Sequence, residues 1–275
     1  MQALPPRPIP VLGPGLGGLR AVRVRQVPAE NATLVCREEV SATVARFVVR
    51  PDAGPAPFLA GQYVALGLQV GDRFVQRPYS MASAPGADAH ELLVRLVPDG
   101  ALTPRLWQLA PGSRVRLGPP KGMFTLQPDD PRPHLLVASG TGLAPFVGMI
   151  RALAAARRPP RLVLVHGVTR ATDLAFRDEL AGLARAGRPC AYEPTISRPD
   201  DPESLGWTGR IGRADQVLPA VLAAWGIDPA GAVAYLCGNP GMVAAAGAAL
   251  AAAGVPPADI HAEEFWTPGA TAPAS

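Results

Sequence analysis

The stretch LLVASGTGLAPFVGMIRALAA, residues 135–155, decides the fold of the second half of this chain. It begins with a compact apolar run, Leu135–Ala138, and continues through a glycine loop, Gly140–Phe146, into a helix that we expect over Ala144–Ala156. Glycines let a backbone approach a ligand closely, and a helix start supplies free N–H groups and a positive dipole end. The order strand, glycine loop, helix predicts a pyrophosphate-binding turn, although a purely structural glycine turn has the same appearance.

The same alternation continues to the C-terminus. Alternating strands and helices are typical of a doubly wound parallel sheet, so we predict an α/β domain. The further strands are expected over Leu162–His166, Ala191–Ile196 and Val233–Leu236, and the further helices near Asp173–Arg185 and over Met242–Ala253.

The first half of the chain has a shorter rhythm of alternating apolar and polar residues divided by turn residues. Short strands at regular spacing predict a closed antiparallel β-barrel. Strands are expected over 33–36, 42–49, 62–66, 91–97 and 114–117, with one short helix over 102–109. A polar, proline-rich linker, Gln127–Pro133, separates the halves. We therefore divide the chain into a Pro/Gly-rich leader (1–25), a barrel domain (26–128), an α/β domain (129–266) and a tail (267–275).

Composition excludes several classes of protein. With 275 residues, 48% of them hydrophobic, the chain can bury two cores, and a net charge of +4 is too small for a dedicated nucleic-acid binder. That charge suits an acidic protein partner as well as an ordinary surface. Three scattered cysteines make neither a disulfide framework nor an iron–sulfur site, and they fit a reducing cytoplasm. The uncharged segment Pro229–Ala258 surrounds a Gly-Asn-Pro-Gly turn and indicates a buried strand–loop–helix, not a membrane span.

Two further motifs can carry chemistry. The motif Arg77-Pro78-Tyr79-Ser80 falls in a barrel strand, where an arginine can clamp a phosphate, a tyrosine can lie against a planar ring and a serine can bond a ring nitrogen. The motif CGNPGM, residues 237–242, follows a strand of the second domain. Taken alone, the four residues RPYS are better explained by a surface arginine and a half-buried strand tyrosine.

Together, RPYS, GTGLAPF and CGNPGM in this order resemble the ferredoxin–NADP reductase superfamily, from about Glu30 to Trp266. Four finer features resemble the bacterial ferredoxin/flavodoxin–NADP reductases: AGQYVALGL (60–68), VPDGALTPRL (97–106), GWTGRI (206–211) and AEEFW (262–266). The resemblance implies a two-domain fold, an antiparallel β-barrel that binds FAD followed by an α/β doubly wound parallel-sheet domain that binds NADP.

On the flavin side, the resemblance implies that Arg77 contacts the FAD pyrophosphate and that Tyr79 and Ser80 lie against the isoalloxazine ring, with Ser80 near N5. Pro78 is expected to belong to the same FAD-binding set. The segment Gly100, Ala101, Leu102 and Thr103 is expected to give N–H groups and a hydroxyl to the flavin phosphates.

On the nicotinamide side, Gly140, Thr141 and Gly142 are implied to face the NADP pyrophosphate, and Cys237 and Gly238 to approach the nicotinamide. A buried small apolar residue is the alternative for Cys237. Ser80, Cys237 and either Glu263 or Glu264 are expected to frame the hydride contact between nicotinamide and flavin.

Four residues bear on the choice of NADP over NAD, because a 2′-phosphate needs cations in the fork geometry of arginine. Ser197 and Arg198 follow the third strand of the second domain, Arg210 lies in the TGRI motif, and Arg170 is a weaker candidate. Each arginine taken alone is compatible with solvated surface.

The aromatic pair near the C-terminus is implied to cover the flavin, with Phe265 near the isoalloxazine and Trp266 near the adenine. A hydrophobic anchor for the tail is the alternative. Many relatives have tyrosine at the first position and end soon after the second, whereas here phenylalanine stands there and nine residues follow.

The implied activity is electron transfer between NADPH and ferredoxin or flavodoxin through FAD, by a cytoplasmic monomer without metal, membrane or nucleic-acid partner. Three alternatives stay open: a reductase that feeds an oxygenase, a free-flavin reductase, and a binding module that has lost turnover. The three cysteines exclude a fused ferredoxin domain within this sequence.

Overall fold

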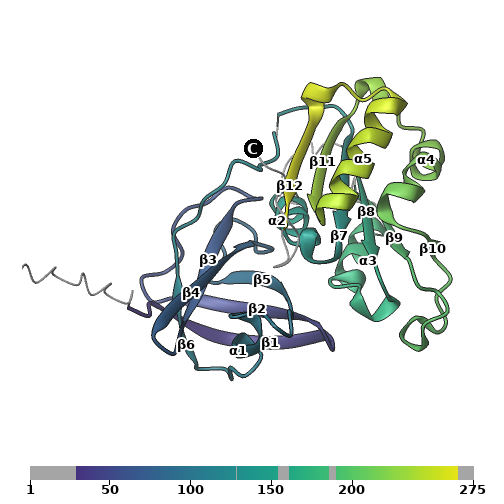
Figure 1. Ribbon diagram of the computed structural model, residues 1–275. Helices are drawn as coiled ribbons and strands as arrows, with labels where there is room; N and C mark the ends of the chain where they lie inside the picture. The colour runs from purple at the N-terminus through teal and green to yellow at the C-terminus, as the bar shows by residue number, and fades with distance from the viewer. Residues whose placement is uncertain (1–28, 128, 154–160, 186–189, 266–275) are drawn as a thin grey trace, which may run out of the picture.

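The computed structural model describes residues 29–127, 129–153, 161–185 and 190–265, which form two domains side by side (Figure 1). The first is an antiparallel barrel and the second a parallel sheet covered by helices on both faces. The predicted leader (1–25) and tail (267–275) lie outside the described residues.

The barrel consists of six strands in the order β4-β3-β6-β1-β2-β5. The edge strands β4 and β5 meet where Met81 pairs with Leu92, and this bridge closes the ring. Side chains at alternate positions, such as Phe47, Leu66 and Val94, fill the interior. The bounds are β1 Ala32–Ser41, β2 Val44–Pro51, β3 Tyr63–Val70, β4 Arg73–Ser80, β5 His90–Arg95, α1 Thr103–Leu106 and β6 Arg114–Leu117.

The second sheet is wholly parallel, in the order β10-β9-β8-β7-β11-β12. Its period-two pattern sends Leu135 and Val137 to the face covered by α4 and α5, and Leu136 and Ala138 to the face covered by α2 and α3. The bounds are β7 His134–Ser139, α2 Ala144–Leu153, β8 Leu162–Val168, α3 Arg177–Arg185, β9 Cys190–Ile196, β10 Arg210–Ile211, α4 Ala214–Trp225, β11 Val233–Gly238, α5 Pro240–Ala253 and β12 Ile260–Glu264.

Both predicted architectures are confirmed, and the differences lie in individual elements. Helix α1 is shorter than the expected 102–109, and three elements of the second domain, β10, α4 and β12, are additional to the predicted set. The sequence of β12, IHAEE, carries charged residues and pairs along one side with β11 only. A polar edge strand of this kind lacks the apolar run by which buried parallel strands are recognised.

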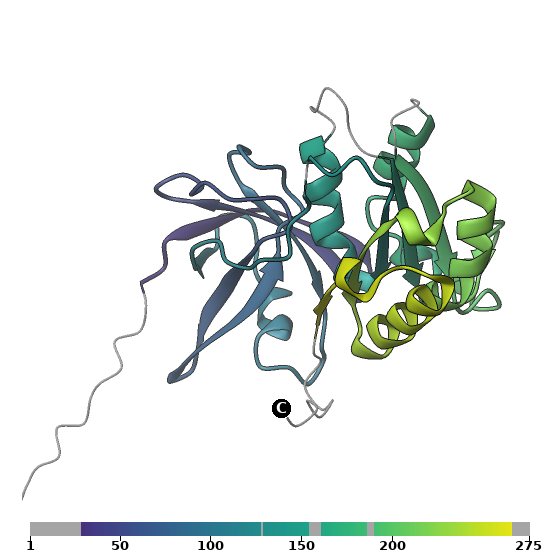
Figure 2. The same ribbon diagram turned by 90° about the horizontal axis from the view of Figure 1, so that it is seen from above.

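Helix α2 forms the contact between the domains, since it lies between the barrel and the parallel sheet (Figure 2). A Cβ added at Gly148 of α2 would lie 2.7 Å from the carbonyl oxygen of Met81, so glycine permits this close approach. Arg151 donates to the Ala82 carbonyl at 2.9 Å and pairs with Glu91 of the barrel and Glu179 of α3. The interface thus combines an apolar core with a partly buried charged cluster.

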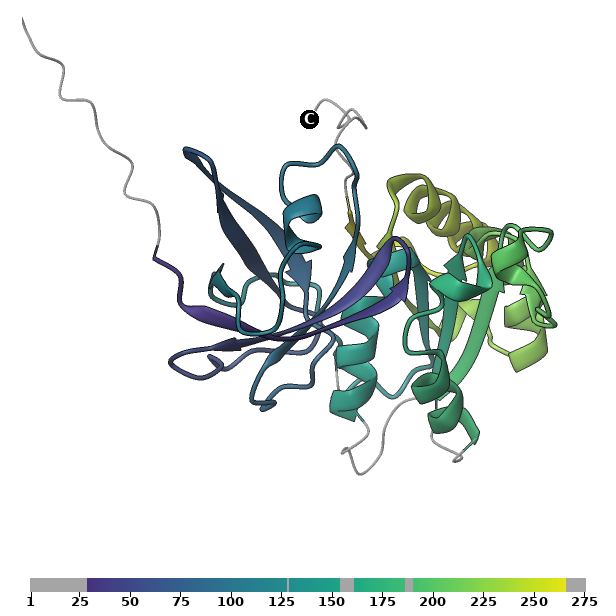
Figure 3. The ribbon, with the colours of Figure 1, turned by 90° about the horizontal axis from the view of Figure 1, so that it is seen from below.

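The hairpin β1–β2 makes a second contact, because it extends beneath the second domain (Figure 3). Ser41, at the end of β1, donates from its hydroxyl to a carboxylate oxygen of Asp173 at 2.7 Å. The hairpin therefore joins the barrel to the second domain at a point separate from α2.

Candidate functional site

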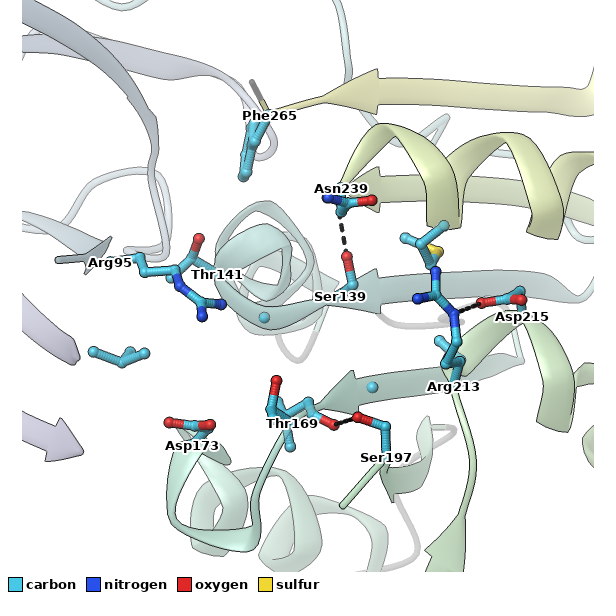
Figure 4. Close-up of a pocket in the computed structure, with 17 residues that line it drawn as sticks. Arg95, Ser139, Thr141, Thr169, Asp173, Ser197, Arg213, Asp215, Asn239 and Phe265 are labelled. Carbon is cyan, nitrogen blue, oxygen red and sulfur yellow. Dashed lines mark hydrogen bonds and ion pairs between the residues drawn. The ribbon is translucent and has the colours of Figure 1, made fainter. Parts of the chain in front are cut away.

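A cavity of about 440 Å³ lies at the carboxyl ends of the parallel strands, against the barrel (Figure 4). The chain leaves β7 for β8 on one side and later returns to β11 on the other, so the strand order reverses at β7. Such a switch point is where open parallel sheets bind ligands. The lining residues are Val44, Arg95, Ser139, Gly140, Thr141, Gly167, Val168, Thr169, Asp173, Ser197, Arg213, Ala214, Asp215, Gly238, Asn239, Met242 and Phe265.

The predicted glycine loop forms one wall of this cavity. Residues Gly140–Leu143 form a short 3-10 turn that continues directly into α2, so N–H groups at a helix start face the cavity. A Cβ at Gly142 would overlap the carbonyl oxygen of Cys237, which explains why glycine stands there. The hydroxyl of Ser139 accepts from the N–H of Asn239 at 2.9 Å and joins this loop to the CGNPGM turn.

His166 of β8 supports the glycine loop through a hydrogen bond. It is fully buried in β8; its Nε2 lies 3.1 Å from the Gly140 carbonyl oxygen and its Nδ1 lies 3.3 Å from the Tyr192 hydroxyl. Burial lowers the pKa of His166 to about 4. The ring is therefore neutral at pH 7, with Nε2–H donating to Gly140 and Nδ1 accepting from Tyr192. Nothing local to His166 in the sequence indicates this contact, because Gly140 lies 26 residues away.

Three of the predicted catalytic residues meet where the domains touch. The hydroxyl of Ser80, at the end of β4, donates to Glu263 at 3.1 Å. Glu263 is the register partner of Cys237, because β11 and β12 pair in parallel. Burial, opposed by the Ser80 hydrogen bond, raises the pKa of Glu263. Burial and the nearby Glu263 charge raise the pKa of Cys237, so its thiol is neutral at pH 7.

The neighbouring C-terminal residues differ in position. Glu264 is exposed, whereas Phe265 lines the cavity and donates its N–H to the Gly238 carbonyl at 2.8 Å. Of the two predicted carboxylates, only Glu263 contacts Ser80. Trp266 lies outside the described residues.

The rest of the RPYS motif follows β4 along the barrel surface. Arg77 is exposed and donates to the Gln76 carbonyl at 2.8 Å, and Pro78 is exposed beside it. Tyr79 is half-buried against the barrel core, and burial raises the pKa of its phenol. Among the described residues the Arg77 guanidinium has no carboxylate partner within 4.0 Å, and Tyr79 lies two residues further along the same strand.

The predicted flavin-phosphate segment is a tight turn before α1. The hydroxyl of Thr103 accepts from the Val97 N–H at 2.9 Å and donates to the Val97 carbonyl at 3.2 Å. Gly100 also donates its N–H to that carbonyl, at 2.9 Å. The hydroxyl is therefore engaged within the turn, which leaves the N–H groups of Ala101 and Leu102 to meet a phosphate.

The predicted 2′-phosphate residues are only partly brought together. Ser197 lines the cavity, and the exposed Arg198 donates its backbone N–H to the Thr169 carbonyl at 3.0 Å. Arg170 pairs with Asp201 at 2.8 Å, and Arg210 pairs with Glu193. Neither of these two guanidinium groups is part of the cavity wall.

Two other arginines line the cavity instead, and sequence analysis missed both. Arg213 caps the start of α4 and pairs with Asp215 at 3.2 Å. The second arginine of the sequence GRIGR, just ahead of a helix, is a signal that could have revealed it. Arg95 comes from β5 of the barrel, and no local sequence signal places a barrel residue beside the glycine loop.

Within the described ranges, no helix is long and apolar enough to cross a membrane, and no group of three or more His, Cys, Asp or Glu side chains could hold a metal ion.

Two family models match the chain, one for each domain. The oxidoreductase FAD-binding domain matches residues 31–126, and the oxidoreductase NAD-binding domain matches residues 136–247. Ferredoxin–NADP reductase B of Sorangium cellulosum is 37% identical over 78% of this chain and 88% of its own length. The chain belongs to the ferredoxin–NADP reductase superfamily. It is therefore an oxidoreductase with FAD- and NAD-binding domains.

Members of this superfamily that resemble the chain have different roles. The toluate 1,2-dioxygenase electron transfer component of Pseudomonas putida is 32% identical over 88% of this chain and 69% of its own length. The crystal structure of an Amycolatopsis cytochrome P450 reductase superposes with a TM-score of 0.75 at 33% identity, covering 86% of this chain and 69% of that one. Similarity to these proteins therefore identifies the superfamily and does not distinguish one electron acceptor from another.

Proposed function

We propose that the protein is an FAD-dependent reductase that transfers electrons between NADPH and a one-electron carrier protein, ferredoxin or flavodoxin. The observation that carries this proposal is the hydrogen bond from Ser80 of the barrel to Glu263 of the parallel sheet, whose neighbour on the next strand is Cys237. A hydride transfer requires two reacting rings within about 3–3.5 Å, and only a site shared by both domains can hold one ring from each side.

The described residues fit a flavin. Tyr79 offers an aromatic face, Arg77 an exposed guanidinium for the pyrophosphate, and the turn at Ala101 and Leu102 free N–H groups. Bound FAD would supply hydride acceptance and release of single electrons. Phe265, which lines the cavity, would cover the ring on the nicotinamide side.

The chain's own residues would orient the reactants and control a proton. The N–H groups of Thr141 and Gly142 would bind the dinucleotide pyrophosphate, with His166 fixing the loop. Ser80 and Glu263 would hold a proton beside the flavin N5, since their hydrogen bond lies at the domain junction. The neutral thiol of Cys237, small and buried, would let the nicotinamide approach without adding charge.

Selection of NADP would fall to residues at the far end of the cavity. Ser197 lines it, and the exposed Arg198 follows in the chain. Its guanidinium has no carboxylate partner among the described residues and can turn toward a 2′-phosphate. Arg170 and Arg210 would have to exchange carboxylate partners for the phosphate, so we rank them below Arg198. An arginine that must leave a carboxylate to bind a phosphate gains less binding free energy than an arginine without an ion-pair partner.

The carrier partner is proposed from charge and from the relatives. A net charge of +4 favours encounter with acidic proteins such as ferredoxin and flavodoxin. A second candidate is a reductase that feeds an oxygenase through a separate carrier, because one relative is named as a dioxygenase component and one neighbour as a cytochrome P450 reductase.

The proposal is tested on the purified full chain. We expect a yellow protein that releases FAD on denaturation, is reduced faster by NADPH than by NADH in stopped-flow absorbance, and then reduces ferredoxin or flavodoxin. A protein without flavin, or one that no nicotinamide reduces, would refute the function. Faster reduction of free flavin than of either carrier would favour a free-flavin reductase, and pull-down of an oxygenase-linked carrier would favour the second candidate.

A further inference from the structure

Helix α2 reaches two separate parts of the candidate site. Its first residue, Ala144, directly follows the glycine loop, and Arg151 lies seven residues further along the same helix. Seven residues are about two helical turns, so the guanidinium-bearing residue stands about 10 Å from the loop along the helix axis. Because the backbone hydrogen bonds make the helix stiff, whatever holds Arg151 in place also holds the glycine loop at the other end of α2.

Arg151 contacts the barrel just beyond Ser80. Its Nη1 donates to the Ala82 carbonyl at 2.9 Å and pairs with the Glu91 carboxylate. Ala82 and Glu91 are themselves joined, since the N–H of Ala82 donates to the carbonyl of Glu91 at 2.8 Å. Ser80, two residues before Ala82, is the residue whose hydroxyl donates to Glu263. The guanidinium of α2 therefore holds the barrel segment that follows Ser80.

The other side of the same guanidinium is held within the second domain. Nε and Nη2 of Arg151 each donate to one carboxylate oxygen of Glu179 in α3, both at 2.7 Å. The Cζ atom also lies 5.2 Å from the centre of the Phe176 ring. The side chain of Arg151 is 22% exposed and that of Glu91 is 11% exposed, so both charges are largely removed from water. A bidentate pair fixes direction as well as distance, so Glu179 orients Nη1 toward the barrel.

Contacts of this kind fix the geometry of an interface more than they add to its stability. The free energy needed to take two charges out of water offsets much of their attraction, so a buried ion pair is weak evidence for stability. The apolar contacts around it, such as Phe146 of α2 against Phe124, are not directional and fix the position of the helix less closely. Hydride transfer requires closer control, because a displacement of about 1 Å can lower the rate by about a hundredfold.

We propose that Arg151 is a positioning residue for hydride transfer, which fixes α2 and the dinucleotide on its glycine loop against the barrel segment that bears Ser80. This inference rests on the proposed function, because hydride transfer between nicotinamide and flavin is the reaction that it concerns. Arg151 is not one of the described residues that line the cavity, so it acts through Ala82 and through α2. It should therefore control the rate of hydride transfer and leave the affinity for the nucleotide almost unchanged.

The test separates rate from affinity on the full FAD-loaded chain. Stopped-flow absorbance gives the limiting rate of flavin reduction at saturating NADPH, and NADPH deuterated at the transferred position shows whether hydride transfer is the step measured. Calorimetry gives the dissociation constant of ADP-ribose, which has the pyrophosphate and lacks the nicotinamide ring. We expect Arg151→Met to lower the limiting rate by about 10- to 100-fold, with a full deuterium isotope effect, and to change the dissociation constant by less than about threefold. Arg151→Lys should fall between, since it keeps the charge and loses the fork.

Arg46→Met is the matched control. Arg46 of β2 pairs with the other oxygen of Glu91 at 2.5 Å and with Glu38, both in the barrel, so its removal takes a cation from the same carboxylate without breaking a contact between the domains. The limiting rate of Arg46→Met should stay within about twofold of wild type, well inside the loss expected from misplacement.

Two additions make the design independent of folding and of turnover. Arg151→Met leaves the Glu179 carboxylate without this partner, so Arg151→Met/Glu179→Gln, which removes both charges, carries the same expected loss of rate if the single variant does not fold. Hydrogen exchange followed by mass spectrometry should show faster exchange of segment 81–83 in both of these variants and wild-type exchange in Arg46→Met.

Several results would overturn the assignment. A wild-type limiting rate in the Arg151 variants would exclude the positioning role, and an equal loss in Arg46→Met would reduce Arg151 to a general contributor to stability. Weaker binding of ADP-ribose with an unchanged rate would assign Arg151 to nucleotide affinity instead. A wild-type protein that NADPH does not reduce would refute the proposed function and the role of Arg151 together, whereas normal reduction of both wild type and Arg151→Met would refute the role of Arg151 alone.

Discussion

His166 should make the stability of this protein depend on pH in a defined window. The ring is fully buried under the glycine loop, and burial lowers its pKa to about 4 from 6.5. Between these values the unfolded chain binds a proton that the folded protein does not. The free energy of unfolding therefore rises with pH across this window. The stability that the neutral His166 ring contributes is complete above pH 6.5 and is lost as pH falls through 4.

The two pKa values set the magnitude. Their difference corresponds to about 3 kcal/mol in full, of which about 2 kcal/mol is lost between pH 7.5 and pH 5. The variant His166→Gln removes the titration and keeps an amide donor for the Gly140 carbonyl. At a urea slope of about 2 kcal/mol/M, the pH-dependent shift in midpoint should be about 1 M larger for wild type than for the variant.

The assay is urea unfolding followed by circular dichroism at pH 5, 6, 7 and 7.5 for both proteins. The pKa values of His90, His134 and Glu263 are also shifted by burial, but these residues are common to both proteins and their effects cancel in the difference. Because His166 also holds Gly140, we expect NADP⁺ affinity of the wild type to fall along with stability at pH 5. Parallel pH curves for wild type and His166→Gln would refute the reasoning.

Three further outcomes are expected. Gly142→Ala should destabilise the protein by about 2 kcal/mol or more in thermal or urea unfolding, because its Cβ would overlap the Cys237 carbonyl. The control Gly182→Ala in α3 places its Cβ in open space and should be neutral or slightly stabilising. Equal effects of the two substitutions would contradict the packing argument. Glu263→Gln should lower the rate of flavin reduction in stopped-flow by about a hundredfold and abolish an ionisation that lies above 4.5, since burial raises the pKa of Glu263; an unchanged pH profile would exclude it from proton control. Arg198→Ala should raise KM for NADPH far more than for NADH in steady-state kinetics, and equal changes would separate Arg198 from the 2′-phosphate.

The local sequence pattern was sufficient to predict the two-domain architecture and the glycine loop around Gly140. The strand, glycine loop and helix around Gly140, and the alternating short strands of the first half, each depend on residues close in sequence, so periodicity and turn residues reveal them. The joint order of RPYS, GTGLAPF and CGNPGM then indicated the superfamily, which the family models confirm. Residue roles at these motifs stay predictions to be tested by mutation.

Only the tertiary structure shows which of the described arginines have a carboxylate partner. Arg170, Arg198 and Arg210 are all candidates from the sequence, yet in the folded chain Asp201 pairs with Arg170 and Glu193 pairs with Arg210. The same holds for His166 under Gly140 and for Ser80 against Glu263, which lie 26 and 183 residues apart. Sequence periodicity indicates which face of its own helix or strand a residue occupies. Ion pairing, burial and the position of Arg95 beside the glycine loop depend instead on distances between segments that are set only when both domains have packed.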